Sequence, residues 1–402
     1  MKIGAVAAVV LLVGGMSAQT RHSVVLHVNE SAGIRRTAYP VNARVPLPRG
    51  ALTDGAKTRL MLDGKEIPAQ ILPETMLWPD GSIQWLQVDF NASIGPRETA
   101  QYELQYGEGV TPGVSLNGPG GNGLAVSETA ETITVGRVQF NKSGAPLLAS
   151  VKYRSELIGK GVNGLVVTDA AGHEHDLSSA TDLKTEVVKS GPLYVGIRYT
   201  GRLPVDSGYS VPFRMLVEMP NSKAWVKVTA LVDDPAKRLR EIAFETPLSL
   251  GPMPWVWDFG TERWTYGALR GATEAVELTQ SVKAAGTSDW KIETGPAGNG
   301  QAYEAGTMDR NKVIRWGHIQ DGKEAIAFAV DVEDGRAPVI GTRRMTIRGD
   351  GQLAIRFAPL RASGTLLMTV YEHYVAPPVQ IGAATSPSSA LSPLVVTVDA
   401  KK

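Results

Sequence analysis

The amino-acid sequence predicts an all-β fold, in which a small N-terminal β-barrel precedes a large antiparallel β-sandwich. Gly (43) and Pro (25) punctuate short runs of Val, Ile, Thr and aromatic residues along the 402 residues, as tight turns between antiparallel strands require. Residues 101–106 alternate strictly between polar and apolar side chains, and no stretch keeps a helical period. Asp-Gly pairs at 63–64, 321–322 and 350–351 each separate two strand-like runs and suit a hairpin turn of type I′.

The first twenty residues predict export. Lys2 precedes an almost unbroken apolar run over residues 3–13, and small residues follow as far as Ala18. This order describes a signal peptide over residues 1–18, cleaved after Ala18. The run is shorter than the roughly 20 apolar residues that span a bilayer, and no later stretch approaches that length. We therefore expect a periplasmic or extracellular protein with no transmembrane segment after cleavage.

Composition excludes several classes of function. The chain has no cysteine, which excludes disulfides, a lipoprotein anchor, thiol catalysis and thiolate metal sites. Lys and Arg number 41 and Asp and Glu number 40, so removal of Lys2 leaves 40 of each. The balanced charge gives no bulk attraction for nucleic acid or an anionic membrane. An acidic substrate would need a local cluster of cations.

Two Gly-rich stretches suggest how the chain is divided. Residues 111–123 belong to a run rich in Gly, Pro, Asn and Ser, which predicts a linker between a barrel over residues 19–110 and a sandwich over residues 124–402. Residues 286–307 are similarly loop-like. Because the strand patterns on the two sides of this second stretch look alike, we interpret it as a long loop within one sandwich. Two smaller domains are the alternative.

The barrel prediction depends on three segments of the first module. They read YPVNARVPLPRG at 39–50, LMLDGKEIPAQ at 60–70 and WPDGSIQWLQVDF at 78–90. In the third segment, Pro-Asp-Gly forms a tight turn, and the apolar parity changes between Trp85 and Leu86. Such a change indicates a β-bulge, and bulges occur at barrel corners. The segments together suit a small closed barrel.

The order of the VPLPRG element, the DGK hairpin and WPDGSIQWL resembles the N-terminal RIFT-type barrel of the exo-rhamnogalacturonan lyase family. The resemblance continues through a central β-sandwich and covers most of residues 38–375. It implies an acidic, uronate-containing polysaccharide of the pectin or rhamnogalacturonan type as the partner, cleaved by β-elimination if the chain is catalytic. Members of that family carry a helical α/α toroid after the sandwich, whereas this chain has no helical hairpins after Tyr374. A non-catalytic carbohydrate-binding or envelope-associated module is therefore the alternative expectation.

Two short segments could supply the chemistry of β-elimination, which needs a base, an acid and a group that neutralises the uronate carboxylate. The first holds Arg315 and His318, and the second holds Tyr371 and His373, which alternation places on one strand face. We assign Tyr371 or His373 as the base and Arg315 as the neutralising cation. The alternative is that both segments are ordinary strands with half-buried Tyr and His side chains.

The segment 255–266 is the best candidate for contacts with sugar. Trp255, Trp257, Trp264 and Tyr266 offer flat faces that suit the apolar faces of sugar rings, and Arg263 suits a carboxylate by bidentate hydrogen bonding. The alternative is a long loop that packs its aromatic side chains over the end of a sandwich.

A metal site could involve His173, His175 and Asp176, whose spacing on a strand permits chelation. Residues 170–172 before them mark a hairpin tip, where polar side chains simply face water. We therefore predict no metal site, and the sequence identifies no cofactor.

Overall fold

The computed structural model describes residues 21–114, 123–206, 208–261, 263, 265–282, 287–309, 312–334, 337–338, 341–359, 364–375 and 392–399. Over these residues the strands pair antiparallel, and one 3-10 turn, η1 (Leu177–Ser179), is the sole helical element. The predicted all-β class is therefore confirmed. No helix in this part of the chain is long and apolar enough to cross a membrane. The predicted signal peptide (1–18), most of the predicted linker (111–123) and Trp264 lie outside the described residues.

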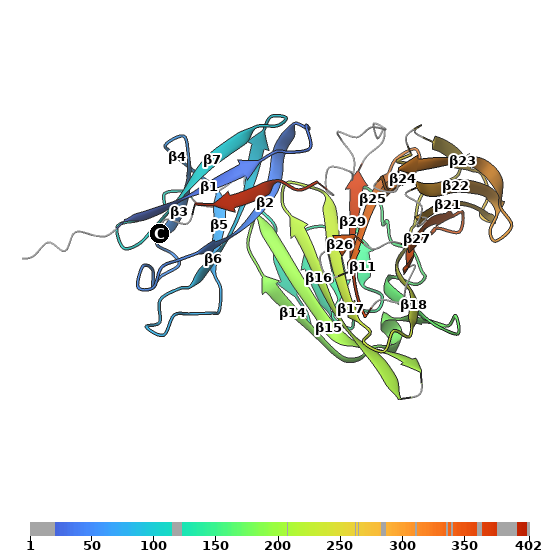
Figure 1. The fold of residues 1–402 in the computed structure, drawn as a ribbon, viewed down its shortest axis with the longest axis horizontal. Coiled ribbons are helices and arrows are strands. Elements are labelled where there is room, and N and C mark those ends of the chain that lie inside the picture. Colours follow the sequence, from blue (N-terminus) through green and yellow to red (C-terminus); the bar gives the residue numbers. More distant parts are fainter. Residues whose placement is uncertain are drawn as a thin grey trace, which may run out of the picture.

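The N-terminal module consists of two sheets that enclose one core (Figure 1). Its five-stranded sheet has the order β30-β1-β7-β3-β4, and its three-stranded sheet has the order β2-β6-β5. The strands are β1 (His22–Asn29), β2 (Arg36–Pro46), β3 (Thr58–Leu62), β4 (Lys65–Ile67), β5 (Ala69–Pro73), β6 (Trp85–Ile94), β7 (Thr99–Tyr106) and β30 (Val395–Val398). The predicted turn between β3 and β4 is present, with Asp63 and Gly64 at positive φ angles of 49° and 76°.

The larger part of the molecule is a sandwich of an eight-stranded and a ten-stranded sheet, with a small four-stranded sheet beside it. The four-stranded sheet contains β8 (Val126–Glu128), β9 (Thr132–Val135), β10 (Val138–Asn141) and β11 (Leu148–Val151). The eight-stranded sheet contains, in spatial order, β13 (Glu174–Asp176), β12 (Gly164–Asp169), β18 (Leu239–Pro247), β28 (Gln352–Pro359), β27 (Gly341–Arg348), β21 (Glu274–Val282), β22 (Thr287–Pro296) and β23 (Gln301–Asp309).

The ten-stranded sheet packs on the eight-stranded one through a single large core. Its spatial order is β14 (Thr181–Lys189), β15 (Tyr194–Asp206), β16 (Tyr209–Pro220), β17 (Trp225–Asp233), β29 (Thr365–Val375), β25 (Ala325–Asp334), β24 (Trp316–Gln320), β19 (Trp255–Phe259) and β20 (Thr265–Leu269), and β26 (Ala337–Pro338) pairs with β25. Alternation fixes which side chains enter that core. In β17, for example, Val226, Val228, Ala230 and Val232 face inward and are buried.

Two predicted loops turn out to be hairpins. The stretch 286–307 contains β22 and most of β23, joined by a turn at 297–300, and the segment 255–266 contains β19 and the start of β20. In both hairpins a Gly residue is accommodated within the sheet beside a large aromatic side chain. Gly306 lies against Trp290, and Gly267 lies against Trp257, so the small residue makes room for a large aromatic neighbour.

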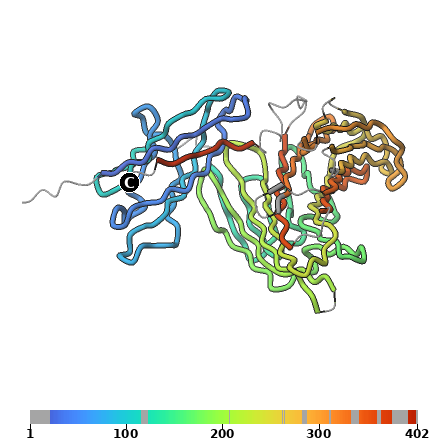
Figure 2. Tube along the Cα trace, in the orientation of Figure 1, coloured from blue at the N-terminus to red at the C-terminus, as the bar shows by residue number. Residues whose placement is uncertain are grey.

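The C-terminal strand corrects the predicted extent of the sandwich, 124–402. Strand β30 pairs antiparallel with β1, so the chain returns from the sandwich to the N-terminal module at its end (Figure 2). Arg36 of β2 reinforces the return, because its guanidinium donates to the carbonyl oxygen of Ser392 over 2.7 Å. Without β30, β1 would be an edge strand with unpaired backbone groups open to any segment that can reach them, and the sequence pattern alone does not specify which segment that is.

The N-terminal module and the ten-stranded sheet share buried contacts. Trp225 and Tyr371 belong to the same core cluster as the module, and the ring of Trp225 meets Tyr39 edge-on at 5.8 Å. Gln70 of β5 donates to the carbonyl oxygen of Tyr194 over 2.9 Å and accepts from its amide over 3.1 Å. Gly191 allows this approach, since a Cβ there would lie 2.2 Å from the Gln70 side chain.

Candidate functional site: a polar pocket on the eight-stranded sheet

The candidate site is a pocket of about 700 Å³ on the face of the eight-stranded sheet that points away from the sandwich core. Strands β18, β21, β22, β27 and β28 form its floor, and the turn at 296–300 forms one wall. Small residues, Ala275 and Ala354 among them, line the floor and leave space above the sheet. Among the described residues no aromatic side chain lines the pocket, so its character is set by charged and hydrogen-bonding groups.

Strand alternation explains why the pocket is polar. In β28 the side chains of Leu353, Ile355 and Phe357 enter the core, so those of Gln352 and Arg356 face outward. The neighbouring strands follow the same rule. They add three Glu residues, a Thr and a second Arg to the pocket lining, namely Glu245, Glu277, Glu293, Thr346 and Arg348.

Three carboxylates lie in one row across the floor. Glu293 is directly opposite Glu277, Glu277 is opposite Thr346, Thr346 is opposite Ala354, and Ala354 is opposite Glu245. Like charges directly opposite each other destabilise an antiparallel pair. The Glu277–Glu293 pair therefore destabilises the sheet locally, on the floor of the pocket.

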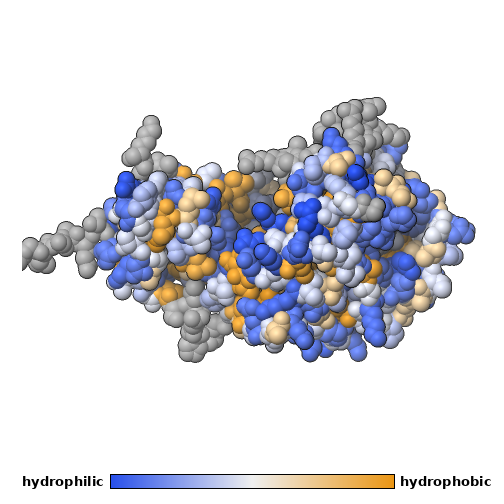
Figure 3. All heavy atoms as spheres, turned by 90° about the horizontal axis from the view of Figure 1, so that it is seen from below, coloured by the Kyte–Doolittle hydropathy of each residue, from blue (hydrophilic) through white to orange (hydrophobic). Residues whose placement is uncertain are grey.

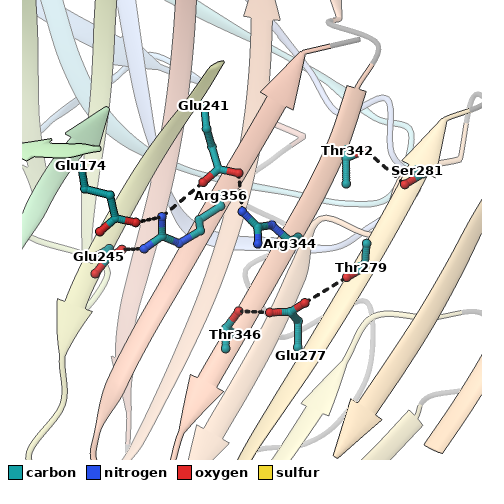
Figure 4. Close-up of polar contacts among 10 residues, drawn as sticks. All are labelled: Glu174, Glu241, Glu245, Glu277, Thr279, Ser281, Thr342, Arg344, Thr346 and Arg356. Carbon is teal, nitrogen blue, oxygen red and sulfur yellow. Dashed lines mark hydrogen bonds and ion pairs between the residues drawn. The ribbon is translucent and has the colours of Figure 1, made fainter. Parts of the chain in front are cut away.

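Hydroxyls and an ammonium group moderate this repulsion. Glu277 accepts hydrogen bonds from the hydroxyls of Thr346 over 2.9 Å and Thr279 over 3.2 Å (Figure 4). Glu293 pairs with Lys291 at 2.8 Å. Each carboxylate can accept further hydrogen bonds, because an ionised carboxyl group has about four lone-pair positions. The two Glu side chains are thus held in place and still have acceptor capacity toward the pocket.

Arg356 organises the other side of the pocket. Its guanidinium donates to Glu174 over 2.6 Å, to Glu241 over 3.2 Å and to Glu245 (Figure 4). Burial raises the pKa of Glu245, and the positive charge of Arg356 opposes that shift. Gln352 donates to Glu245 over 3.1 Å, so this corner of the pocket is held by several hydrogen bonds at once.

The predicted catalytic pair on β29 lies elsewhere, at the junction with the N-terminal module. Tyr371 and His373 share a strand face, as predicted, and both rings meet Trp225 edge-on at 5.8 and 5.9 Å. Burial raises the pKa of Tyr371 and lowers the pKa of His373 to about 4. A phenol with a raised pKa is a poor base at neutral pH. Packing between the modules accounts for both side chains.

Arg315 and His318 occupy two further environments. Arg315 pairs with Asp331 at 3.4 Å. His318 is 2% exposed, and its Nδ1 hydrogen-bonds Asp258 on the facing strand β19. The Nε2 of His318 is buried with no hydrogen-bond partner in the described part of the chain. None of the four residues assigned to catalysis lines any of five cavities found in the described part of the chain.

The predicted sugar-binding residues divide into packing and surface groups. Trp255 and Trp257 are buried in the sandwich core because β19 points its odd-numbered residues inward. Tyr266 is 62% exposed, and its carbonyl oxygen accepts from the hydroxyl of Tyr303 over 2.7 Å. Arg263 is exposed and lies 3.8 Å from Glu304. The hypothesis of aromatic stacking on this segment therefore applies to Tyr266 alone among the described aromatic side chains.

The His173 region holds no metal cluster within the described ranges, where no group of three or more ligand side chains is arranged for an ion. His173 and His175 both hydrogen-bond the same oxygen of Asp169, at 3.1 and 3.4 Å. The Glu174 side chain between them extends to Arg356 instead.

Residues of the polar pocket were missed by the sequence analysis, although a signal was present. Polar or small side chains occur at every second position in β18, β27 and β28, alternating with buried apolar ones. Such a pattern is typical of any half-exposed strand. The pattern forms a pocket because the register of the sheet places three such strands side by side, and the register cannot be read from the pattern.

Comparisons with known proteins bear on the fold. No family model matches the sequence, and no curated protein matches it. An alpha-mannosidase from Enterococcus faecalis V583 aligns with a TM-score of 0.51 and 12% identity, over 94% of this chain and 46% of that chain. A protein of glycosyl hydrolase family 38 from Enterococcus faecalis aligns with a TM-score of 0.50 and 11% identity, over 94% of this chain and 48% of that chain.

These solved structures share the β-rich fold, and at such identities the likeness shows the fold alone. The chain spans about half the length of each of them. The resemblance to exo-rhamnogalacturonan lyases stays a prediction, since these comparisons do not test it.

Proposed function

We propose that this protein is exported and binds carbohydrate, and that the polar pocket on the eight-stranded sheet holds a neutral, hydroxyl-rich sugar unit. The opposed carboxylates of Glu277 and Glu293 on the pocket floor carry the proposal. Sugar hydroxyls donate to carboxylates, and such charge-assisted hydrogen bonds are stronger than neutral ones. Arg348 and the amide of Asn299, which also line the pocket, add donors for hydroxyl oxygens.

The fold supports a sugar ligand. The two solved structures named above are described as an alpha-mannosidase and as a member of a glycosyl hydrolase family, which are proteins that act on carbohydrate. The activities in those descriptions belong to the whole proteins, and this chain spans about half the length of each. For this chain we carry over only the class of ligand, and a fold by itself does not determine function.

Binding without turnover is the function we favour. A catalytic acid or base needs a pKa near the working pH and access to the reacting atoms. In the pocket, Glu245 is tied to Arg356, and the two other carboxylates are held by hydroxyls or by Lys291. This arrangement suits a rigid binding surface.

A second candidate function is the β-elimination of an acidic, uronate-containing polysaccharide of the pectin type, as the family resemblance implies. A cation-lined cleft between the N-terminal module and the sandwich favours an acidic ligand. Purified protein incubated with uronate polymers would release unsaturated products that absorb in the near ultraviolet. Absence of such products from every polymer tested would leave binding as the function.

The test of the pocket is calorimetric titration with a neutral galactose trimer. Glu277→Gln should weaken binding about tenfold or more, equivalent to about 1.4 kcal/mol. The same substitution should leave the melting temperature unchanged or raise it, because it removes the repulsion from Glu293. Glu128→Gln is the matched control, since Glu128 is an exposed carboxylate on the separate four-stranded sheet. Unchanged affinity in Glu277→Gln, or no binding of neutral sugars by the wild type, would refute the assignment.

A further inference from the structure

A cavity of about 350 Å³ lies between the small four-stranded sheet and the ten-stranded sheet. Strands β9, β10 and β11 line one side, and the turn that joins β16 to β17 lines the other. Trp225 lines it as well, so the cavity adjoins the junction with the N-terminal module, where hydrophobic residues gather on the face seen in Figure 3. We call this cavity the apolar pocket, and its described lining residues are all different from those of the polar pocket.

Most of the wall of this pocket is apolar. The four-stranded sheet contributes valines, and the strands that flank the turn contribute further aliphatic side chains, namely Val135, Val138, Val151, Met219 and Val226. A cavity of about 300–1,000 Å³ with mainly hydrophobic walls is typical of a small-molecule site. At roughly 30 Å³ for each water molecule, the space corresponds to about twelve non-hydrogen atoms of a ligand.

All of the charge on the pocket lining is positive. Arg137, Lys152 and Lys223 line the pocket, and none of its described lining residues is an Asp or a Glu. This local excess contrasts with the balanced charge of the whole chain. Positive charge beside low-dielectric walls raises the local concentration of anions. The pocket therefore combines an apolar interior with a preference for negative charge.

Two of these cations lack a carboxylate partner. Arg137 and Lys152 are exposed, and within the described part of the chain neither forms an ion pair. The amide of Lys152 donates to the carbonyl oxygen of Arg137 over 3.0 Å, so the two residues are neighbours at one end of the β10–β11 pair. Neighbouring like charges are unfavourable in a sheet, and an anion beside both would relieve their repulsion. The guanidinium of Arg137 stacks over the ring of Tyr153 at 5.5 Å, which holds it at the pocket wall.

Lys223 adds a third positive charge from the opposite side of the pocket. Its ammonium group donates to the carbonyl oxygen of Thr37 over 2.9 Å, which fixes it beside the N-terminal module. Burial lowers the pKa of Lys223, and the charge of Arg36 lowers it further. The pKa of His373 is lowered by burial and by Lys223 in the same way. The contribution of a neighbouring cation to both shifts indicates a positive potential in this region.

The carboxylates near the pocket bind other donors. The charges of Glu156 and Glu372 reach Tyr374, which lines the pocket, yet neither glutamate lines the cavity itself. Glu156 accepts from the amide of Val151 over 2.8 Å, and Glu372 accepts from the hydroxyl of Tyr374 over 2.7 Å. A counter-ion for the cations of the pocket would therefore come from a ligand.

We infer that the apolar pocket binds an amphipathic monocarboxylate of the size of a medium-chain fatty acid, with its chain among the valines and its carboxylate on Arg137 and Lys152. A guanidinium binds a planar carboxylate through two parallel hydrogen bonds. An inorganic anion would leave the apolar wall without a contact, and a neutral apolar compound would leave the two cations without a counter-ion. The inference goes beyond carbohydrate binding and concerns a separate site of the molecule.

The test compares octanoate, 1-octanol and acetate, each titrated calorimetrically into the full chain. Octanoate should occupy a single site and bind about tenfold or more tightly than 1-octanol, because hydrogen bonds to charged groups add to burial of the chain. Acetate, which has no chain to bury, should not bind measurably. Arg137→Gln and Lys152→Gln should each weaken octanoate binding about fivefold and leave 1-octanol binding unchanged. Lys160→Gln is the matched control, because Lys160 is an exposed lysine of the same segment that does not line the cavity.

Equal affinity for octanoate and 1-octanol, full octanoate affinity in either variant, or an equal loss in Lys160→Gln would each overturn the inference. Many weak octanoate sites on one chain would overturn it as well. Arg137 and Lys152 are exposed, so their replacement should leave the melting temperature unchanged, and a loss of binding then reports on the site. The two proposals fail separately, because Glu277→Gln should leave octanoate binding intact and Lys152→Gln should leave binding of the neutral galactose trimer intact.

Discussion

His373 and Tyr371 show how burial decides what a side chain does. Both face the junction with the N-terminal module, where Trp225 contacts each ring. His373 is also repelled by the ammonium group of Lys223, which adds to the effect of burial in disfavouring the imidazolium form. A histidine in this setting acts as a neutral packing group.

The first prediction concerns the pH dependence of stability that follows from His373. Its pKa falls from 6.5 in the unfolded chain to about 4 in the fold. The unfolded state therefore binds more protons between these pH values, so stability is full above pH 6.5 and is lost as the pH falls toward 4. We expect a contribution of about 2 kcal/mol, less than the full shift because the side chain keeps some contact with solvent.

Urea unfolding of wild type and His373→Phe between pH 4 and pH 7.5 measures this contribution. The difference in the free energy of unfolding should shift by about 2 kcal/mol in favour of the variant as the pH is lowered. Parallel pH profiles for the two proteins would contradict the prediction. A burial-driven shift should also persist in high salt, because screening acts mainly on exposed charges.

The sequence could predict part of this arrangement. Alternation placed Tyr371 and His373 on one face, and the structure confirms that placement. It could not predict what covers that face, since Tyr39 and Trp225 come from segments far apart in the chain. The sequence-based assignment of these residues to catalysis depended on an open face, which only the three-dimensional packing of the modules decides.

At the scale of elements, hairpins with an Asp-Gly turn were predictable because their chemistry is local. The turns at 63–64, 321–322 and 350–351 all join paired strands. The hairpin β19–β20 was missed because its aromatic-rich sequence looked like a binding loop, whereas Trp255 and Trp257 fill the core between the sheets. The polar pocket was missed for a related reason, as its residues come from five strands that only the register brings together.

The second prediction concerns the ion network across β13, β18 and β28. Arg356 neutralises Glu241 and Glu245, which are 4% and 5% exposed. Arg356→Met should lower the free energy of unfolding by about 3 kcal/mol at neutral pH, because it leaves buried carboxylates without their cation. Part of this loss should be recovered at low pH, where the carboxyl groups are protonated.

Arg344→Met is the matched control for this network. Arg344 is more exposed than Arg356 and pairs with Glu241 alone, which would keep its bond to Arg356. Its replacement should cost clearly less, on the order of 1 kcal/mol. Equal losses in the two variants, measured by urea unfolding, would contradict the central role of Arg356.

At the scale of the whole molecule, the N-terminal module and the sandwich are joined in two ways. Their contact surface contains a common core around Trp225, and the chain passes back to the module through β30 (Figure 1). Lys189 on β14 and Asp89 on β6 add a buried ion pair across the same surface. The cavity lined by β2, β5 and β6 on one side and by β14, β15 and β16 on the other continues this contact, so its shape depends on the modules staying together.

The third prediction follows from the shared core. The N-terminal module and the sandwich share buried apolar contacts around Trp225, so neither can unfold without exposing apolar surface of the other. The wild type should therefore unfold in a single calorimetric transition. Trp225→Ala should remove the ring that packs against Tyr39, Tyr371 and His373 and lower stability by about 3–5 kcal/mol. Without the indole ring to couple them, the module and the sandwich should melt in two separate transitions.

Trp85→Ala provides the comparison, since Trp85 belongs to the N-terminal module but stacks under Arg44 outside the shared core. This variant should melt in one transition and lose less stability. Hydrogen exchange sharpens the test, because amides of β2 and β6 should exchange faster than those of β16 and β17 in Trp225→Ala but not in Trp85→Ala. Two transitions in the wild type would mean that the modules are stable independently. One transition in Trp225→Ala, with a destabilisation no larger than in Trp85→Ala, would mean that contacts other than the indole ring couple the modules. The hydrogen bonds between Gln70 and the backbone of Tyr194 would be the first of those contacts to test.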